Sequence, residues 1–306
     1  MIVVCGEALI DVIHSVDGTQ RTAPGGGAFN TARALARLGV PTAFLGRLSD
    51  DAFGAQLAGL LASDGVRLEL APVGPEPTTT ALAELDRLGS AEYEFLVHGT
   101  SAPNFTPDML PAHLGADVAA LHLGSLGLVL EPMADTLVEL AHREREGRLL
   151  MLDPNIRIGL APESDHRNRV YDVISQSTIV KASEGDLAWL YRGLNYERAA
   201  DRMLSEGVPM VVVTRGAQGA FGANRSFRIA VDAPQVDVVD TIGAGDAFGA
   251  ALLAWLHDHG AVRPDLCLEE EELKEALDFA CLAAALTCTR PGADPPWKWE
   301  MAARPT

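Results

Sequence analysis

A glycine turn followed by a carboxylate is the part of this sequence best suited to chemistry. The turn is Gly243-Ala244-Gly245, and Asp246 follows it at the start of an apolar run that is typical of a helix. The first N–H groups of a helix have no partner within it, so the turn is expected to bind an anion. A carboxylate beside phosphate suits phosphoryl transfer, in which an alcohol is oriented and loses its proton. The segment predicts a kinase.

The same location predicts a low pKa for Asp246. The positive end of a helix favours an ionised carboxylate, which lowers the pKa and makes the group a weak base. A weak base is sufficient where the transfer is largely dissociative and the alcohol proton leaves late.

Further polar groups follow the predicted strands. Gly25-Gly26-Gly27 leads into a helix that carries Asn30, and the absence of side chains lets a ligand approach the backbone, although a plain helix entry is the alternative. Asp11 comes shortly after the first strand, at the edge where open α/β sheets bind ligands, although a turn or cap residue is the alternative. The segment 153–157 supplies a carboxylate, an amide and the guanidinium of Arg157 at the same edge.

The residues that follow two more predicted strands are suited to binding a metal ion and a phosphate. The segment 181–186 carries acidic groups that suit a hydrated Mg²⁺ ion, although such groups usually cap a helix. The segment 213–219 is a Gly-rich turn that can bring N–H groups to phosphates. No Gly-x-x-x-x-Gly-Lys-Ser/Thr sequence occurs, and the glycines near position 245 lack the dinucleotide-binding spacing.

The composition argues against several classes of partner. The formal net charge is −18, from 42 acidic and 24 basic residues, which disfavours nucleic acid and anionic membranes. No apolar run reaches the ~20 residues of a membrane span, and the 4 cysteines have no Cys-x-x-Cys spacing. We expect a cytoplasmic protein with reduced thiols.

Short β-rich runs alternate with amphipathic helical patterns, which predicts a parallel sheet covered by helices on both faces. The expected strands are Ile2–Cys5, Thr42–Leu45, Val118–Leu123, Leu149–Asp153, Ile179–Lys181 and Met210–Thr214. The expected helices each stop at a glycine and are Asn30–Leu38, Ala52–Asp64, Pro132–Glu146 and Tyr196–Glu206.

Two segments lack the continuous apolar runs of buried parallel strands and alternate polar with apolar residues. We expect them, at about 12–23 and 76–100, to form a small separate sheet. Because both leave and re-enter one core, the prediction is a lid within a single domain that spans residues 1–306.

Together these residues resemble the ribokinase-like (PfkB) family of carbohydrate kinases. The match runs from Gly6-Glu7-Ala8-Leu9-Ile10-Asp11 to Arg290-Pro291-Gly292-Ala293, and its most specific part is Asp240-Thr241-x-Gly-Ala-Gly-Asp246-x-Phe248. The resemblance implies a three-layer α/β/α sandwich with a small β-sheet lid. It also implies Mg²⁺- and ATP-dependent phosphorylation of a primary alcohol.

The resemblance implies roles for individual residues. Asp246 would be the catalytic base, and the amides of Gly243, Ala244 and Gly245 the anion hole. The sugar would be contacted by Asp11, Gly26, Gly27, Asn30 and Arg157. The nucleotide would be contacted by Lys181, Ser183, Thr214, Gly216, Gly219 and Gly245.

Metal ions enter through the same resemblance. The family's magnesium-linked Asn-x-x-Glu element aligns with Ser183-Glu184-Gly185-Asp186, so Asp186, one methylene shorter than Glu, would act on Mg²⁺ through water. Many relatives also bind K⁺ near the anion hole through backbone carbonyls. The corresponding residues are Asp240, Ile242, Thr287, Arg290 and Gly292.

Three segments bear on the substrate. His122-Leu123-Gly124-Ser125, Asp153-Pro154-Asn155-x-Arg157 and Glu92-Tyr93-x-Phe95 most resemble fructokinases, so fructose and ATP are the expected substrates. The alternatives are a 2-keto-3-deoxygluconate kinase, a ribokinase-type kinase, and a sugar- or nucleotide-binding protein of the same fold without turnover. A homodimer through the lid is also expected.

Overall fold

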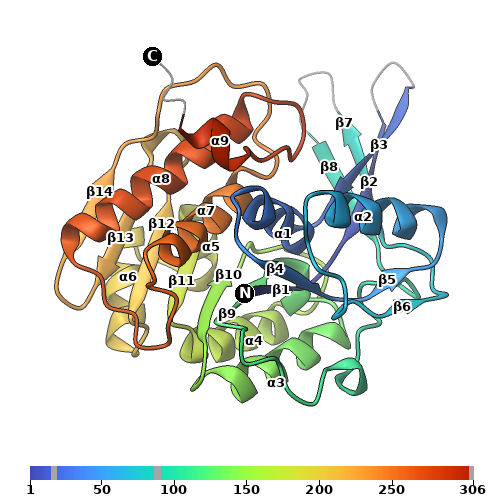
Figure 1. Cartoon of the computed structure of the whole chain (residues 1–306), viewed down its shortest axis with the longest axis horizontal. Coiled ribbons are helices and arrows are strands. Elements are labelled where there is room, and N and C mark those ends of the chain that lie inside the picture. Colours follow the sequence, from blue (N-terminus) through green and yellow to red (C-terminus); the bar gives the residue numbers. More distant parts are fainter. Residues whose placement is uncertain (15–18, 86–90, 303–306) are drawn as a thin grey trace.

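The computed structural model describes residues 1–14, 19–85 and 91–302, and an eight-stranded sheet forms its centre (Figure 1). The strand order is β14-β13-β12-β11-β10-β9-β1-β4. The strands from β12 to β4 are parallel, and β13 and β14 extend the sheet in antiparallel fashion. Their bounds are β1 Ile2–Cys5, β4 Thr42–Leu45, β9 Ala120–Gly124, β10 Leu149–Asp153, β11 Ile179–Ser183, β12 Met210–Thr214, β13 Ala220–Asn224 and β14 Arg228–Val231.

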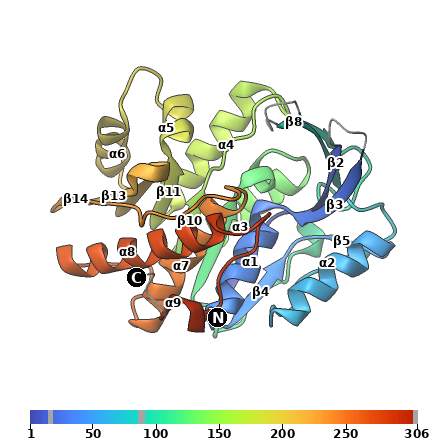
Figure 2. The ribbon, with the colours of Figure 1, turned by 90° about the horizontal axis from the view of Figure 1, so that it is seen from above.

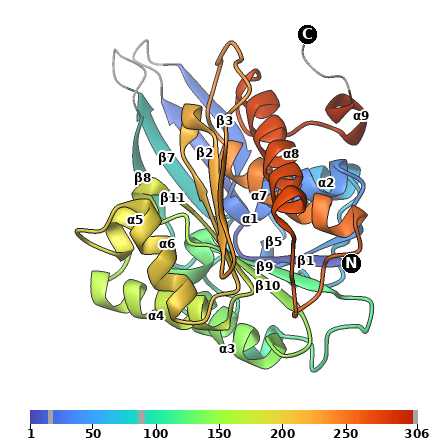
Figure 3. The same cartoon turned by 90° about the vertical axis from the view of Figure 1, so that its left-hand side faces the viewer.

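Helices cover both faces of this sheet (Figure 3). One face packs against α1 (Gly27–Arg37), α2 (Ala52–Ser63), α7 (Ala244–Asp258) and α8 (Glu270–Cys288). The other packs against α3 (Met133–Glu144), α4 (Glu163–Gln176), α5 (Glu184–Leu190) and α6 (Tyr196–Ser205). Alternate side chains of β1 enter the two apolar clusters, with Ile2 in one and Val3 in the other. The predicted three-layer α/β/α arrangement is confirmed.

A second sheet of four strands stands beside the first in the order β3-β2-β7-β8. Its strands are β2 (Leu9–His14), β3 (Gln20–Gly25), β7 (Thr80–Leu85) and β8 (Ala91–Leu96). The segments 12–23 and 76–100, which we expected to form a lid, contribute to these strands. The first of them is not one strand, because β2 and β3 run antiparallel.

The remaining elements are short. β5 (Leu48–Ser49) pairs with β6 (Val73–Gly74), and α9 (Lys298–Met301) lies near the end of the chain. Three 3-10 helices lie at η1 (Pro107–Met109), η2 (Ser125–Leu128) and η3 (Gly216–Gln218). Among the helices of the described residues, none combines the length and apolar character that a bilayer span requires. All four cysteines carry free thiols.

Asp51 links the start of α2 to the segment that leads into β7. Its Oδ1 accepts a hydrogen bond from the Gly54 amide at 2.7 Å and caps the helix. Its two carboxylate oxygens also accept from Thr78, Oδ1 from the hydroxyl at 2.6 Å and Oδ2 from the amide at 2.8 Å. Thr78 lies two residues before β7, so one carboxylate anchors the entry to a strand of the second sheet.

We expect Asp51→Ala to lower the free energy of unfolding by about 1–3 kcal/mol, because it removes a helix cap and the two bonds to Thr78. Urea denaturation of the variant and wild type measures this. The neighbouring exposed Asp50 is the control, and Asp50→Ala should change stability by less than about 0.5 kcal/mol. Equal losses in the two variants would show that Asp51 does not anchor the second sheet.

Candidate active site

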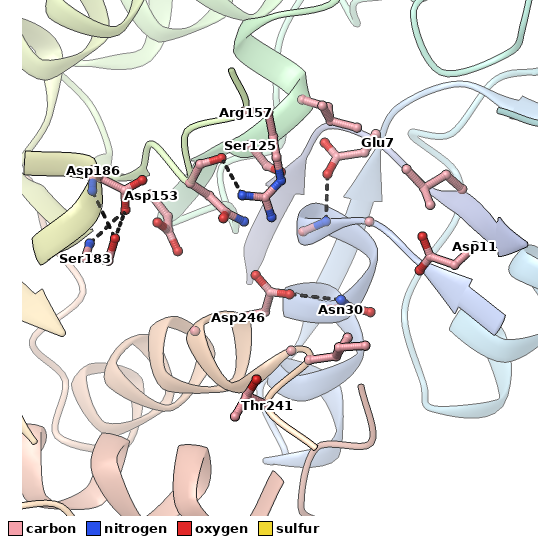
Figure 4. Close-up of a pocket in the computed structure, with 18 of the residues that line it drawn as sticks. Glu7, Asp11, Asn30, Ser125, Asp153, Arg157, Ser183, Asp186, Thr241 and Asp246 are labelled. Carbon is pink, nitrogen blue, oxygen red and sulfur yellow. Dashed lines mark hydrogen bonds between the residues drawn. The ribbon is translucent and has the colours of Figure 1, made fainter. Parts of the chain in front are cut away.

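A cavity of about 620 Å³ lies where the carboxyl ends of the central strands face the second sheet (Figure 4). Strand ends contribute Asp153, Ser183 and Thr214, while the second sheet contributes Leu9 and Phe95. The predicted site residues that line the cavity are Asp11, Gly26, Gly27, Asn30, Arg157, Lys181, Ser183, Asp186, Thr214, Ile242, Gly243, Gly245 and Asp246. The predicted residues outside its lining are Ala244, Gly216, Gly219, Asp240, Thr287, Arg290 and Gly292.

The predicted anion hole is the start of α7. Gly243 precedes the helix with a left-handed φ of 77°, and a Cβ there would lie 2.6 Å from the Cβ of Ala293. Both the conformation and the space therefore require glycine. The amides of the first turn of α7 point toward the cavity end of the helix, where an anion would compensate them.

Asp246 is the third residue of α7 and faces α1, which packs beside α7 (Figure 2). Its Oδ2 accepts a hydrogen bond from the Asn30 side-chain amide at 2.9 Å. Burial raises the pKa of Asp246, and the Asn30 bond and the charges of Lys181 and Arg157 do not outweigh it. The expectation of a lowered pKa is therefore wrong, because desolvation exceeds the effect of the helix end. The raised pKa makes Asp246 a stronger base than the sequence indicated.

A buried ion pair lies beside the predicted anion hole. Lys181 Nζ is 2.6 Å from Asp153 Oδ2, and both side chains are about 95% buried. Burial alone would lower the pKa of Lys181, but the hydrogen bond to Asp153 and the combined attraction of Asp153, Asp246 and Asp186 outweigh burial and raise it. A Cβ built at Gly245 would lie 3.2 Å from Lys181 Nζ, so the cation sits directly against the predicted phosphate position. The sequence placed Lys181 at a strand end, whereas it lies inside β11.

Asp11 and Arg157 both line the cavity. Asp11 lies within β2 of the second sheet and not at the carboxyl end of β1, where the sequence placed it. Burial raises the pKa of Asp11 to about 6, against the attraction of Arg157. The Arg157 guanidinium donates to the backbone carbonyls of Asn155 and Ile156 at 3.3 and 3.2 Å. A hydroxyl-rich ligand between the two would meet an acceptor and a donor.

Asp186 is occupied by hydrogen bonds within the protein. Its Oδ2 accepts from the Ser183 amide at 2.8 Å and the Ser183 hydroxyl at 2.6 Å, which completes a capping box at the start of α5. Its Oδ1 accepts from the Ile156 amide at 2.8 Å. No group of three His, Cys, Asp or Glu side chains able to hold a metal occurs in the described part of the chain.

The loop before α7 is tied to the end of the chain through Asp240. Its Oδ1 accepts from the Ile242 amide at 3.0 Å, and its Oδ2 accepts from the Gly292 amide at 2.8 Å. These bonds bring three of the residues predicted near K⁺ together. Arg290 forms ion pairs with Glu300 and Asp294, and Thr287 is buried in α8.

Glu7 also lines the cavity, although the sequence pattern predicted no role for it. It is 1% exposed and its Oε1 accepts a hydrogen bond from the Gly27 amide at 2.6 Å. Burial raises the pKa of Glu7 to about 7, against the hydrogen bond from Gly27. The residue stands between Gly6 and Ala8 after the first strand, and nothing in that pattern marks the carboxyl group as buried.

The chain matches the profile of the pfkB family carbohydrate kinases over residues 1–300. A fructokinase of Rhizobium leguminosarum bv. trifolii is 38% identical over 285 residues, which cover 91% of this chain and 87% of that protein. The chain therefore belongs to the pfkB family of carbohydrate kinases. The prediction of an ATP-dependent carbohydrate kinase is confirmed at this level.

Solved structures agree with this membership. A fructokinase of Xylella fastidiosa with bound ATP has a TM-score of 0.91 at 25% identity, covering 99% of this chain and 97% of that chain. A fructokinase of Vibrio cholerae O395 in a form with fructose, ADP and calcium ion has a TM-score of 0.85 at 27% identity, covering 95% and 94%. The ribokinase-like fold is confirmed.

Glu7→Gln should stabilise the protein at high pH and not at low pH. Because the pKa of Glu7 is raised in the folded protein, ionisation of Glu7 destabilises the folded state. This loss of stability is absent below the ordinary pKa near 4.5 and grows until the pH passes about 7. We expect the glutamine variant to gain on the order of 1–3 kcal/mol at pH 8 and little at pH 5. Chemical denaturation at both pH values measures the difference.

Glu300 provides a control of opposite sign. Burial would raise its pKa, but hydrogen bonds from Trp297 and Arg290 outweigh burial and lower it. Glu300→Gln should therefore lose stability at pH 8. A Glu7→Gln effect that does not change between pH 5 and pH 8 would contradict the assigned burial of the charge.

Proposed function

We propose that the enzyme phosphorylates D-fructose at a primary hydroxyl, with ATP as phosphoryl donor. The observation that carries the proposal is the position of Asp246 at the cavity end of α7, beside Lys181 and the first-turn amides. The sugar is inferred from the fructokinase relatives and from the fructose in the Vibrio cholerae structure.

Asp246 acts as the general base. Its raised pKa lets it take the proton of the attacking hydroxyl, and the Asn30 amide fixes its orientation. The amides of Gly243, Ala244 and Gly245 form the anion hole that compensates charge on the transferred group. Lys181 adds a fixed cation beside it.

The sugar lies against Asp11, Gly26, Gly27, Asn30 and Arg157. At Gly26 a Cβ would lie 2.8 Å from the Glu7 carbonyl oxygen, and φ is 109°, so only glycine fits this turn, which lines the cavity. Arg157 donates to sugar oxygens while Asp11 accepts from hydroxyls on the other side.

The nucleotide lies along the ends of β11 and β12. Ser183 and Thr214 line the cavity there, and Lys181 and Gly245 meet the phosphates. Gly216 and Gly219 form the turn after β12, outside the cavity lining, where both have positive φ. We assign this turn to the part of the nucleotide that extends beyond the cavity.

Metal ions complete the proposal. Mg²⁺ bound with ATP neutralises phosphate charge, and because Asp186 already accepts three hydrogen bonds, it acts only through metal-bound water. Backbone oxygens near Asp240, Ile242, Thr287, Arg290 and Gly292 would hold K⁺. The bonds from Ile242 and Gly292 to Asp240 favour such a loop site.

The second sheet is proposed to act as a lid over the sugar. It carries Asp11 and Phe95 at the cavity, and its closure would exclude water that competes for the phosphoryl group. We also propose a homodimer through this sheet within a single-domain protomer. Free thiols fit a reducing compartment, and we place the enzyme in the cytoplasm.

Asp246→Asn should lower kcat at least ~10²-fold, since the variant keeps the size of the side chain but loses the base. ATP and fructose should still bind, as isothermal titration would show. A variant that keeps most of its kcat would remove Asp246 from the mechanism. A wild type that binds both ligands without turnover would favour a non-catalytic binding protein.

Asp186→Ala should raise the Mg²⁺ concentration needed for half the maximal rate, while Asp186→Glu should retain the wild-type value. Initial rates over a Mg²⁺ series at saturating ATP measure both. An alanine variant that melts earlier but keeps the wild-type Mg²⁺ dependence would make Asp186 a capping residue alone.

Fructose should have a higher kcat/KM than ribose, 2-keto-3-deoxygluconate or fructose 6-phosphate. Arg157→Ala should lower the kcat/KM for fructose by an amount equivalent to ~1–3 kcal/mol of transition-state binding, which is the scale of a lost charged hydrogen bond. Coupled assays of ADP release over the four sugars measure both. A preference for another sugar would overturn the fructose assignment, and an unaffected variant would remove Arg157 from the sugar site.

A further inference from the structure

Three carboxylates lie along the short segment that runs from Gly25 into α1. Asp11 is beside Gly25, where a Cβ would lie 2.4 Å from its Oδ2. Glu7 accepts from the amide at the start of α1, and Asp246 accepts from a side chain about one turn further along. In Figure 4 Glu7 lies above the other two, and horizontally it falls between them. A sugar phosphorylated at Asp246 and held at its far end by Asp11 would pass Glu7 with its ring.

Glu7 is buried, yet only one of its carboxylate oxygens accepts a hydrogen bond within the described residues. Oε1 accepts from the Gly27 amide, whereas Oε2 has no hydrogen-bond partner in the described residues. The Ser125 hydroxyl lowers the pKa of Glu7 against burial, and Ser125 lines the cavity together with Glu7. A Cβ built at Gly27 would lie 2.9 Å from Ser125 Oγ. Glu7, Gly27 and Ser125 therefore form one polar cluster at the cavity wall.

The backbone of Ser125 supports a role in the site. Its φ is 52°, in the left-handed region that residues other than glycine rarely adopt. Such conformations persist where the surrounding structure imposes them, and they gather at ligand sites. Here the conformation follows β9 directly and leaves Ser125 lining the cavity beside Glu7.

We propose that Glu7 is a positioning residue for the sugar: it accepts a hydrogen bond from the Ser125 hydroxyl, which leaves the Ser125 oxygen to accept one from a ring hydroxyl of the substrate. A serine hydroxyl alone can donate or accept. With its hydrogen held by a carboxylate, it can only accept, so it selects a sugar hydroxyl that donates. The inference rests on the proposed function, which supplies the sugar and its orientation.

Fluorinated sugars test the direction of this hydrogen bond, because fluorine cannot donate one. Between the two CH₂OH ends of fructofuranose, the ring carries hydroxyls on C3 and C4. The probes are therefore 3-deoxy-3-fluoro- and 4-deoxy-4-fluoro-D-fructose. Wild type should lose about tenfold or more in kcat/KM at one of the two positions, the scale of one hydrogen bond. In Ser125→Ala the kcat/KM values for fructose and for that fluorinated sugar should differ by no more than about threefold.

Glu7→Gln separates positioning from a structural role. Its amide oxygen can still accept from Gly27, but its NH₂ group would donate to Ser125 and turn the Ser125 hydroxyl toward the sugar as a donor. In this variant the kcat/KM for fructose should exceed that for the fluorinated sugar by no more than about threefold. The fructose KM should rise about tenfold with kcat and the ATP KM nearly unchanged.

Asp64→Asn is the matched control. Asp64 is also a buried carboxylate held against α1, through ion pairs with Arg33 and Arg37, but it does not line the cavity. This variant should keep the wild-type discrimination even if its melting temperature falls.

The inference is overturned if Glu7→Gln and Ser125→Ala both keep the wild-type discrimination at both positions, or if wild type shows none. It is also overturned if the KM values for ATP and fructose rise together in Glu7→Gln. A wild type that does not phosphorylate fructose would overturn the proposed function itself, a result distinct from those seen with an active enzyme.

Discussion

The charge of Asp246 is the constraint on which the rest of the site depends. A carboxylate withdrawn from water is costly unless donors and cations compensate it. Here the compensation comes from Asn30 on α1, from Lys181 on β11 and from Arg157 after β10, three segments that lie apart from Asp246 in the sequence. The compensation remains incomplete, since the pKa of Asp246 is raised. That imbalance is useful, because a carboxylate with a raised pKa accepts a proton more readily.

The cation beside the predicted anion hole has its own requirement. Lys181 is the only one of the chain's three lysines that is buried, and the carboxylates of Asp153, Asp246 and Asp186 together favour its charged form. Asp153 ends β10 and Lys181 lies in β11, so the pair forms only because these strands are neighbours in the sheet. In a chain with a net charge of −18, one fixed cation at the proposed phosphate position has a large local effect.

Backbone rather than side chains forms much of the cavity wall. Gly26 and Gly243 both have positive φ, and each is so tightly surrounded that a Cβ would approach neighbouring atoms to under 3 Å. These turns place N–H groups at the positions proposed for the phosphate and the sugar. The second sheet then adds Asp11 from β2, which completes the cavity on the side away from α7.

The sequence by itself determined the elements and the chemistry class. Apolar runs located β1, β4, β10 and β12 to the residue, because buried parallel strands need side chains that are apolar on both faces. The glycine turn before Asp246 indicated an anion site and a kinase, because backbone conformation and helix ends are local properties.

Only the tertiary structure decided how the charged groups behave. The direction of the Asp246 pKa shift, the burial of Glu7 and the pairing of Lys181 with Asp153 all depend on which distant segments exclude water. Likewise, Asp11 follows β1 in the chain, yet its place in a second sheet is set by pairing with residues 80–84. Desolvation and long-range pairing are properties of the packed molecule, and local sequence patterns carry no record of them.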